Sequence, residues 1–313
     1  MLEFNTSTED DKPTDLTEEA SVSKAIGGTK VTSTTLKTLN NKFKVFSTYS
    51  ILGGTTTQTF KTQPLEVRYE NTATGLKWTY DEKAKWFASA NYKFRAIWPA
   101  EFKILDNSNE NLIIAEYNIT QHNTDLLVAY ATRHPAVDPE HYDAVEMNFK
   151  HALSALCFKI KYGDDVDPSI TDELTDVYLQ NLCVVGLMTY GGSSPDQISW
   201  SHSLSDSEQR YHWSKKTGDP VKSFGVGESK AVTVYDGDGI IFVIPQNIGA
   251  QSTAFHFKTT LGKTHDFFTY LPQGAWEPGK LYTYVITLYS SSLEVAVSIK
   301  DWKDIKSNVD IRL

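Results

Sequence analysis

Histidine, cysteine and acidic side chains are the residues of this chain that could do chemistry, but their spacing specifies no site. The eight histidines are scattered along the sequence. His134 and His141 lie seven residues apart in a predicted loop, and His202 and His212 flank another; neither pair has a third ligand at metal-site spacing. The two cysteines are too few for a four-thiolate zinc site or a disulfide framework. We therefore expect no metal and no cofactor.

Cys157 and Cys183 each lie within an apolar run, in the segments ALCFKI and NLCVVGL. A cysteine in such surroundings is most often a buried, unreactive thiol. If the chain is exported, the two could instead form a disulfide, because oxidising compartments allow disulfides to persist. Their spacing in the sequence does not decide between these two states.

Motifs of the common enzyme classes do not occur in this sequence. There is no HExxH, GxSxG or G-x-x-x-x-G-K-[ST] pattern, and no GxGxxG follows a predicted strand. Gly225–Lys230 (GVGESK) resembles a phosphate loop only superficially, since its spacing is wrong and no helical pattern follows. Asp236 and Asp238 could bind calcium, but a calcium loop needs more oxygen ligands, so a hairpin turn is the simpler interpretation. Nothing marks a carboxylate pair for glycoside hydrolysis, and we expect a protein that is not an enzyme.

Chain length and net charge further limit the classes of protein to which this chain can belong. With 313 residues the chain has room for about two domains. Its net charge is 30 − 39 = −9, so no basic surface favours phosphate backbones and nucleic-acid binding is not expected. No apolar run approaches ~18–20 residues, so no transmembrane helix is expected either.

The elements that must position any functional residue are predicted to be short β-strands. Apolar and polar residues mostly alternate with period two, between breaks rich in Gly, Pro, Asn and Asp. After one weak strand before Gly27, the first half is expected to contain Lys42–Leu52, Leu65–Tyr69, Leu76–Tyr80, Asn91–Trp98, Asn111–Ile119 and Asp125–Thr132. The second half is expected to contain one long strand with room for a bulge, Val145–Tyr162, then Val177–Met188, Gln197–His202, Gln209–Trp213, Lys230–Tyr235, Gly239–Pro245, Thr253–Thr260, Thr264–Leu271, Lys280–Tyr289 and Leu293–Ile299.

These strands are expected to form two domains. His134–Glu140 (HPAVDPE) is the best linker candidate, which places the boundary near residues 135–145. We expect residues 19–140 to be the N-terminal domain and residues 141–313 the C-terminal domain. Short, evenly spaced strands without interleaved helices predict antiparallel β-sandwiches for both. Residues 1–18 are polar and acidic and are predicted to be a disordered tail.

The N-terminus shows no basic start followed by an apolar segment, so no export signal is visible. Two interpretations follow from the residues alone. Either the protein is cytoplasmic, or it is exported and its signal has been removed.

Several sequence blocks occur together in a fixed order. They are Lys42–Ser50 (KFKVFSTYS), Trp86–Pro99 (WFASANYKFRAIWP), Asp125–Ala131 (DLLVAYA), Val145–Ile160 (VEMNFKHALSALCFKI), Ile244–Gln246 (IPQ), Trp276–Leu288 (WEPGKLYTYVITL) and Val297–Trp302 (VSIKDW). In this order the set resembles the fimbrillin-like family of the Bacteroidales, the subunits of type V pili, over roughly residues 20–313.

The resemblance implies a fold and a location. It implies two tandem transthyretin-like β-sandwiches, which agrees with the two predicted strand series. It also implies a secreted lipoprotein at the outer membrane or in a fimbrium, with the export signal removed. The lipidated cysteine of such a protein is not in this sequence.

The resemblance further implies assembly by strand exchange. In shaft subunits of the family a first strand is cut away at a basic residue, and a strand of the next subunit fills the groove by β-augmentation. Here Ala20–Ile26 is the candidate first strand, with apolar Ala20, Val22 and Ile26, and Lys30 is the candidate cleavage site. The family often carries Arg at that site, so Lys30 is a departure, and shaft, tip and anchor roles all remain open. The alternatives for Ala20–Ile26 are an ordinary, permanent first strand, which is the simpler interpretation, and a disordered tail.

The C-terminal segment has the alternation of a strand, with Val309, Ile311 and Leu313 at every second position. It is either a donor strand or the last edge strand of a sheet. We expect a fimbrial or cell-adhesion subunit whose partners are other pilus subunits, together with a receptor or glycan on a host or bacterial surface. The alternative is a surface glycan-binding lipoprotein that stacks Trp and Tyr on sugars.

Overall fold

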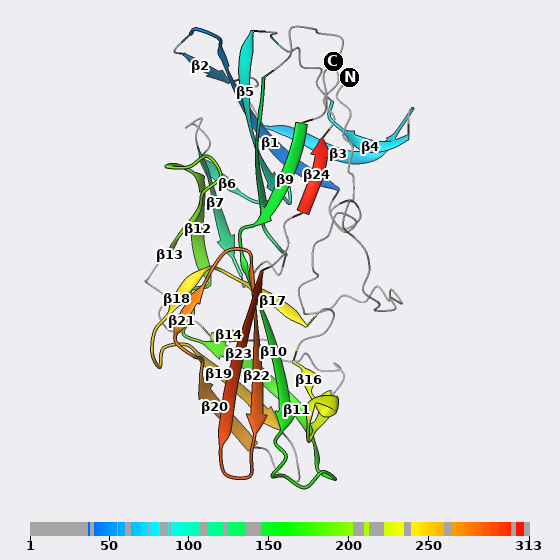
Figure 1. The fold of residues 1–313 in the computed structure, drawn as a ribbon, viewed down its shortest axis with the longest axis vertical. Coiled ribbons are helices and arrows are strands. Elements are labelled where there is room, and N and C mark those ends of the chain that lie inside the picture. The colour runs from blue at the N-terminus through cyan, green and yellow to red at the C-terminus, as the bar shows by residue number, and fades with distance from the viewer. Residues whose placement is uncertain are drawn as a thin grey trace.

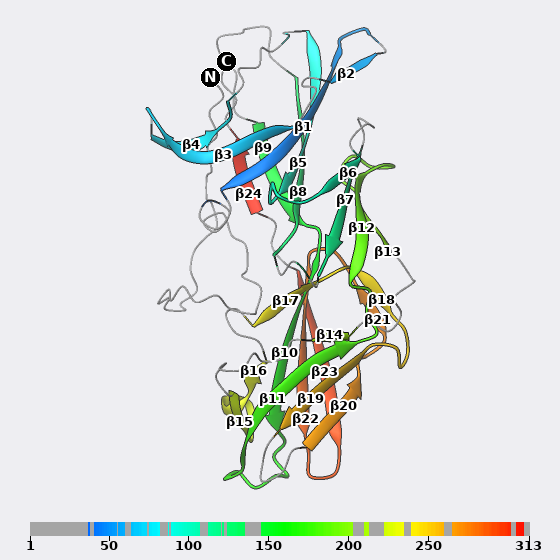
Figure 2. The ribbon, with the colours of Figure 1, turned by 180° about the vertical axis from the view of Figure 1, so that it is seen from behind.

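The computed structural model describes residues 37, 41–54, 56–59, 64–73, 75–81, 87, 89–106, 112–119, 121, 124–134, 145–202, 210–212, 222–234, 239–259, 265–301 and 305–309. Most of these residues lie in β-strands, which are joined by turns, loops and one short 3-10 turn at Glu228–Lys230. The strands before residue 80, together with β5, β8, β9 and β24, gather at one end of the molecule, and β10, β11, β19, β20, β22 and β23 lie at the other (Figures 1 and 2). The predicted all-β class is confirmed.

All strand pairs of the N-terminal sheet are antiparallel, but the order of its strands across the sheet does not follow their order in the sequence. Its strand order is β24-β9-β8-β5-β1-β3-β4, with β2 paired to β1. The strands are β1 (Lys42–Ile51), β2 (Thr57–Thr59), β3 (Leu65–Thr72), β4 (Gly75–Thr79), β5 (Ala90–Trp98), β8 (Leu127–Arg133), β9 (Val145–His151) and β24 (Ile305–Val309). Two members of this sheet therefore come from beyond residue 144, and one of them comes from the end of the chain.

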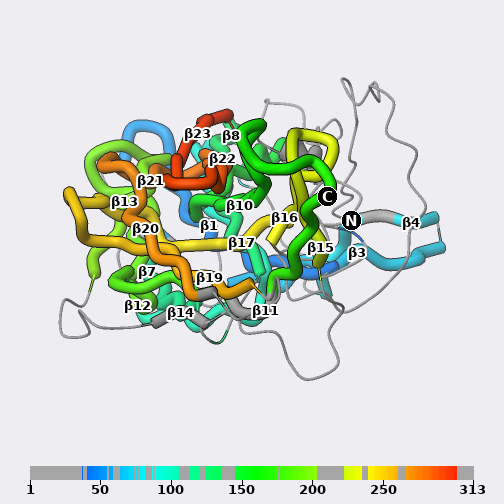
Figure 3. Tube along the Cα trace, turned by 90° about the horizontal axis from the view of Figure 1, so that it is seen from below, coloured from blue at the N-terminus to red at the C-terminus, as the bar shows by residue number. Residues whose placement is uncertain are grey.

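The other end of the molecule is a two-layer arrangement. One sheet has the order β16-β10-β22-β23 with β17 on β10, and the facing sheet has the order β14-β11-β19-β20 with β15 on β11. Seen along the long axis, β10, β22 and β23 form one layer and β11, β19 and β20 the other (Figure 3). The strands are β10 (Ser154–Tyr162), β11 (Thr171–Gln180), β14 (Arg210–His212), β15 (Lys222–Gly225), β16 (Val232–Thr233), β17 (Ile240–Val243), β19 (Ala254–Thr259), β20 (His265–Tyr270), β22 (Lys280–Leu288) and β23 (Leu293–Asp301).

Two smaller sheets connect these parts. One has the order β13-β12-β7-β6 and the other pairs β18 with β21. Their strands are β6 (Ile104–Asp106), β7 (Leu112–Asn118), β12 (Val185–Gly191), β13 (Ile198–His202), β18 (Gln246–Ile248) and β21 (Gly274–Trp276).

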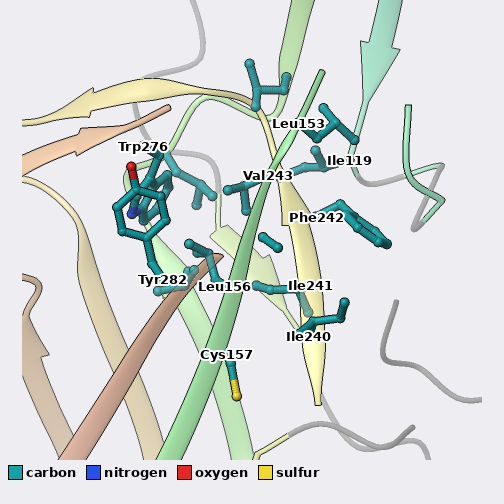
Figure 4. Packing of buried hydrophobic residues seen from close by; sticks show 14 of the residues in the cluster. Ile119, Leu153, Leu156, Cys157, Ile240, Ile241, Phe242, Val243, Trp276 and Tyr282 are labelled. Carbon is teal, nitrogen blue, oxygen red and sulfur yellow. The ribbon is translucent and has the colours of Figure 1, made fainter. Parts of the chain in front are cut away.

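Buried aromatic and aliphatic side chains hold the two layers together. Phe158 of β10 stacks on Phe255 of β19 with ring centroids 4.4 Å apart, and on Tyr284 of β22 at 5.0 Å. Figure 4 shows the neighbouring part of this core, where Leu156 lies among Ile241 and other apolar side chains. Full burial of one such side chain contributes about 1.5–3 kcal/mol, so these layers are stable because their facing sides are apolar.

Two predicted strands and the expected antiparallel pairing of one strand pair were wrong. Val145–Tyr162 is two strands, because Ala152 and Leu153 break the ladder and turn the chain from the N-terminal sheet into the C-terminal layers. Val177–Met188 likewise covers the end of β11 and the start of β12, which belong to different sheets. One pair, β10 with β22, is parallel, since the chain builds the whole facing sheet before it returns beside β10.

The domain boundary stays a prediction, as does the transthyretin-like arrangement. The expected tail at residues 1–18 and most of the expected linker lie outside the described residues. Among the residues that are described, no helix is long and apolar enough to cross a membrane.

Candidate functional site: an edge strand closed by the C-terminal segment

Strand β9 is the place where the predicted C-terminal strand meets the rest of the molecule. Its residues alternate strictly, with Val145, Met147 and Phe149 buried and Glu146 and Asn148 exposed. This period-two pattern is what a strand needs when one of its faces covers a core. The three buried side chains belong to the core of the N-terminal sheet, and Phe149 packs edge-on against Phe43 at 5.4 Å between ring centroids.

Strand β24 closes the outer edge of β9. The two strands are antiparallel, with Ile305 opposite Phe149 and Val309 opposite Val145. On the inner side β8 pairs only with residues 149–151 of β9, so β24 is the described pairing partner of residues 145–148. Figure 1 shows β24 beside β9, at the end of the molecule away from β23.

The opposite end of β9 is firmly anchored. His151 and Asp125 are both fully buried, and His151 Nδ1 lies 2.5 Å from Asp125 Oδ2. The other oxygen of Asp125 accepts the Leu126 N–H at 2.8 Å, and the Ala152 N–H donates to the Leu126 carbonyl at 2.7 Å. Buried polar groups that satisfy one another in this way hold a strand end in one position. Strand β9 is therefore held by buried polar contacts at residue 151 and by pairing with β24 near residue 145.

An ion pair adds a second link from β9 to the small sheet beside it. Lys150 Nζ lies 2.7 Å from Asp196 Oδ2, in the turn between β12 and β13. The hydrogen bond from Lys150 lowers the pKa of the Asp196 carboxyl, and the Ser194 hydroxyl lowers it further. Because both side chains are partly exposed, this pair contributes little to stability and serves mainly to orient the turn.

The structure places only part of the predicted exchange machinery. Of the C-terminal donor positions, Val309 lies in β24, whereas Ile311 and Leu313 lie outside the described residues. The candidate first strand Ala20–Ile26, with Val22, and the candidate cleavage site Lys30 also lie outside them. Sequence reasoning did not identify β9 as the pairing partner of the C-terminal strand. The alternation of VEMNF indicated this strand. The prediction of one long strand over Val145–Tyr162 hid the fact that β9 ends at His151 and borders the edge of a sheet.

A second surface feature is a row of aromatic rings on the outer face of the β11-β19-β20 sheet. Tyr178 stacks on His256 with centroids 4.3 Å apart, and His256 contacts the edge of Phe268 at 4.6 Å. Phe268 in turn meets Tyr270 at 4.7 Å, and these two side chains are 48 % and 41 % exposed. The row crosses three neighbouring strands because the register sets Tyr178, His256 and Phe268 directly opposite one another.

The tryptophans that the glycan-binding alternative would stack on sugars pack within the molecule where they are described. Trp78, Trp98 and Trp276 are buried, and half-buried Trp200 donates its Nε1–H to the Ala152 carbonyl at 2.9 Å. The aromatic row was not foreseen, although adjacent Phe267 and Phe268 in one strand must point to opposite faces.

Metal binding and cysteine chemistry are the remaining candidates in the described part of the chain. No group of three or more His, Cys, Asp or Glu side chains there could hold a metal ion. Cys157 and Cys183 are both free thiols, so the disulfide alternative is not realised. Burial raises the pKa of the Cys157 thiol, which suppresses its reactive thiolate form.

Comparisons with known proteins agree with this fold. A family model described as fimbrillin-like matches residues 29–302. The structure is similar to a fimbrial protein from Bacteroides vulgatus, with 15 % identity, a TM-score of 0.61, and coverage of 89 % of this chain and 99 % of that one. It is also similar to a putative cell adhesion protein from Bacteroides uniformis, with 17 % identity, a TM-score of 0.52, and coverage of 89 % and 97 %. No curated protein matches the chain.

Proposed function

Because this chain belongs to the fimbrillin-like family, we propose that it is a non-enzymatic fimbrial subunit that joins other subunits by strand exchange. The donor is the C-terminal segment with Val309, Ile311 and Leu313, and the acceptor is the β9 edge between Val145 and Phe149. The pairing of β24 with β9 carries this proposal, because it brings a segment from the far end of the chain to the edge of the N-terminal sheet.

Exchange of β24 between copies keeps the same interactions. A second copy's β24 can form the same antiparallel ladder on β9 that this chain's own segment forms, so little free energy separates the two arrangements. The joint is durable when the alternate apolar positions of the donor fill the face that Val145 and Met147 cover, at about 1.5–3 kcal/mol for each buried aliphatic side chain.

The N-terminal part of the proposal concerns processing. Ala20–Ile26 serves as a first strand that competes for a sheet edge, and cleavage at Lys30 releases it. Ala20–Ile26 and the C-terminal segment lie outside the 29–302 match, whereas Lys30 lies inside it. The proposed location is the cell surface, in a fimbrium or on the outer membrane as an exported lipoprotein.

The test compares the full chain with a chain that ends at residue 304, each with and without limited Lys-specific proteolysis. The treated full chain is expected to form SDS-resistant ladders, and the shortened chain is expected to stay monomeric because it lacks the donor strand. A K30Q variant is expected to stay monomeric too, because the proposed cut cannot occur.

A peptide of residues 302–313 provides the matched control. It is expected to bind the shortened chain, whose β9 edge is open, and to bind the full chain more weakly. The same peptide with I305K and V309K, the positions opposite Phe149 and Val145, is expected to bind the shortened chain at least about tenfold more weakly, since two apolar anchors are lost. Ladders from the shortened chain, or equal binding of the two peptides, would rule out this donor.

The aromatic row supports a second role, adhesion through a glycan. Exposed Phe268 and Tyr270 offer flat apolar faces, and half-buried Tyr178 and His256 support them from the neighbouring strands. Sugar rings stack on such faces through their C–H groups. We expect the full chain to bind members of a glycan array and F268A/Y270A to lose that binding. L76A, which shortens an exposed side chain on β4, is the control and is expected to bind as the wild type does.

A further inference from the structure

Strand β23 is a long edge that no described strand covers. It ends the β16-β10-β22-β23 sheet, pairs with β22 along all nine of its residues, and has no partner on its other side within the described chain. Most of its residues are exposed. Natural proteins usually protect such an edge by keeping it short, bulged, or charged at its centre, because its free N–H and C=O groups are a template for another strand.

The side chains of β23 also favour pairing with another strand, because they are apolar on one face. Leu293 and Val295 pack partly against the core of the two layers, and the same face continues with Val297 and Ile299, which are 40 % and 59 % exposed. Val297 lies opposite the buried Tyr284 of β22, and Ile299 lies opposite the buried Tyr282. The apolar face that is buried on β22 therefore continues onto the edge strand β23. None of the strands that the structure describes covers this row.

We infer that β23 pairs with β23 of a second copy of this chain, antiparallel, about a twofold axis at Val297. In this register Val297 lies opposite its own counterpart and Val295 lies opposite Ile299, twice by symmetry. On the other face Glu294 lies opposite Lys300, again twice. Apolar side chains thus meet apolar ones on one face, and opposite charges meet on the other, which are the favourable cross-strand pairs of a sheet.

Other registers lose this match. Residues directly opposite in an antiparallel pair share a face, so the register can shift only in steps that keep Val297 opposite a residue of its own row. A centre at Ala296 sets Glu294 opposite Ser298, and a centre at Ser298 sets Lys300 opposite Ala296. Only the centre at Val297 pairs both charges. At the ends of this register Leu293 lies opposite Asp301, whose carboxylate is already held by Lys280.

The resulting contact differs from the exchange of β24. It joins two copies through one continuous sheet, is the same on both copies, and closes on itself, so it cannot propagate a fibre alone. It would link subunits side by side, whether or not β24 is exchanged. Because it buries only an edge and one apolar row, we expect a dissociation constant in the micromolar range.

The test is sedimentation equilibrium of the full chain without proteolysis, with charge-reversal variants of exposed residues. The wild type is expected to dimerise at concentrations up to about 100 µM. E294K and K300E each replace two attractive pairs by two repulsive ones, and each is expected to weaken dimerisation at least about tenfold. V297K sets two like charges on the axis and is expected to weaken it similarly.

Mixing the two single variants makes the test specific to this register. E294K presents lysines at positions 294 and 300, and K300E presents glutamates at both, so an equimolar mixture is expected to form a heterodimer of about wild-type affinity. K258E, a charge change on β19, is the control and is expected to dimerise like the wild type. A wild-type chain that stays monomeric at about 100 µM, or a mixture that stays as monomeric as its components, would overturn the inference.

Discussion

At the scale of single residues, two polar groups buried in the core of the C-terminal layers form a hydrogen-bonded pair. Trp276 donates its Nε1–H to the Tyr284 hydroxyl at 2.9 Å, and both side chains are buried. Burial raises the pKa of Tyr284 to about 12, because the low-polarity surroundings disfavour the phenolate. The pair lets two large aromatic residues fill the core beneath β21 and β22 without leaving an indole N–H unsatisfied.

Tyr284 gives a prediction about stability and alkaline pH. Y284F removes the acceptor of the Trp276 N–H, so we expect the free energy of unfolding at pH 8 to fall by about 1–3 kcal/mol. The wild-type hydroxyl has a raised pKa in the folded state, so its contribution is complete below pH 10, the usual tyrosine pKa, and declines as pH rises towards 12. The difference between variant and wild type should therefore shrink between pH 10 and 12.

Urea unfolding at pH 8 and at pH 11.5 checks this prediction. Y270F, which changes an exposed hydroxyl in β20, is the control and is expected to unfold like the wild type at both values. A Y284F difference that is the same at both pH values would contradict the assigned role of burial.

At the scale of elements, tight turns decide where strands begin. Gly279 precedes β22 with φ of +70°, a conformation that side-chain-bearing residues rarely adopt. Its N–H donates to the Leu153 carbonyl at 2.9 Å, at the point where the chain passes from β9 to β10. This turn sets the register of the parallel β10–β22 pair, since it attaches the start of β22 beside the start of β10.

The turn yields a prediction with a matched control. G279A forces alanine into the left-handed region and is expected to lower the free energy of unfolding by about 1–2 kcal/mol. Gly274 lies in the neighbouring strand β21, has no positive φ, and has no atom within 4 Å of an added methyl group. G274A is therefore expected to change the free energy of unfolding by less than about 0.5 kcal/mol. Chemical denaturation of both variants measures the difference, and equal effects would show that φ is not the cause.

At the scale of the whole molecule, the two cores share strands. Ile97 of β5 and Val128 of β8 belong to the core of the C-terminal layers and the linking sheets, while Trp98 and Leu127 beside them belong to the core of the N-terminal sheet. Adjacent residues of a strand point to opposite faces, so the ends of β5 and β8 separate the two cores and cover both. The two ends of the molecule are therefore coupled through packed side chains.

This sharing predicts that the N-terminal region does not fold without β9. A fragment ending at residue 134 lacks Val145, Met147 and Phe149, which fill its core, and it is expected to show no cooperative thermal unfolding transition. A fragment ending at residue 152 restores these side chains and is expected to show near-UV circular dichroism and to be more resistant to protease. If the shorter fragment unfolds cooperatively at the same temperature as the longer one, β9 is dispensable.

Local patterns in the sequence predicted the strands well but not their partners. The alternation in Lys42–Leu52, Lys280–Tyr289 and Leu293–Ile299 corresponds to β1, β22 and β23 within a few residues. Short strands such as β6, β18 and β21 were missed, because two or three residues carry no measurable period. The candidate site was predicted only in part. Val309 was expected in a strand, but that its partner would be Val145 depends on a contact across more than half of the chain.

The sequence by itself determined that this protein is built from strands, that it carries no recognisable catalytic or metal motif, and that its blocks occur in the order of a fimbrillin-like chain. Those properties are local, since they depend on period, residue type and spacing. Tertiary structure alone decided that β24 closes the edge of β9, that β10 pairs parallel with β22, and that no strand among the described residues covers the outer edge of β23. The physical reason is that hydrogen bonds between strands join residues distant in sequence, and a strand's own alternation shows which face is apolar but not which edge is free.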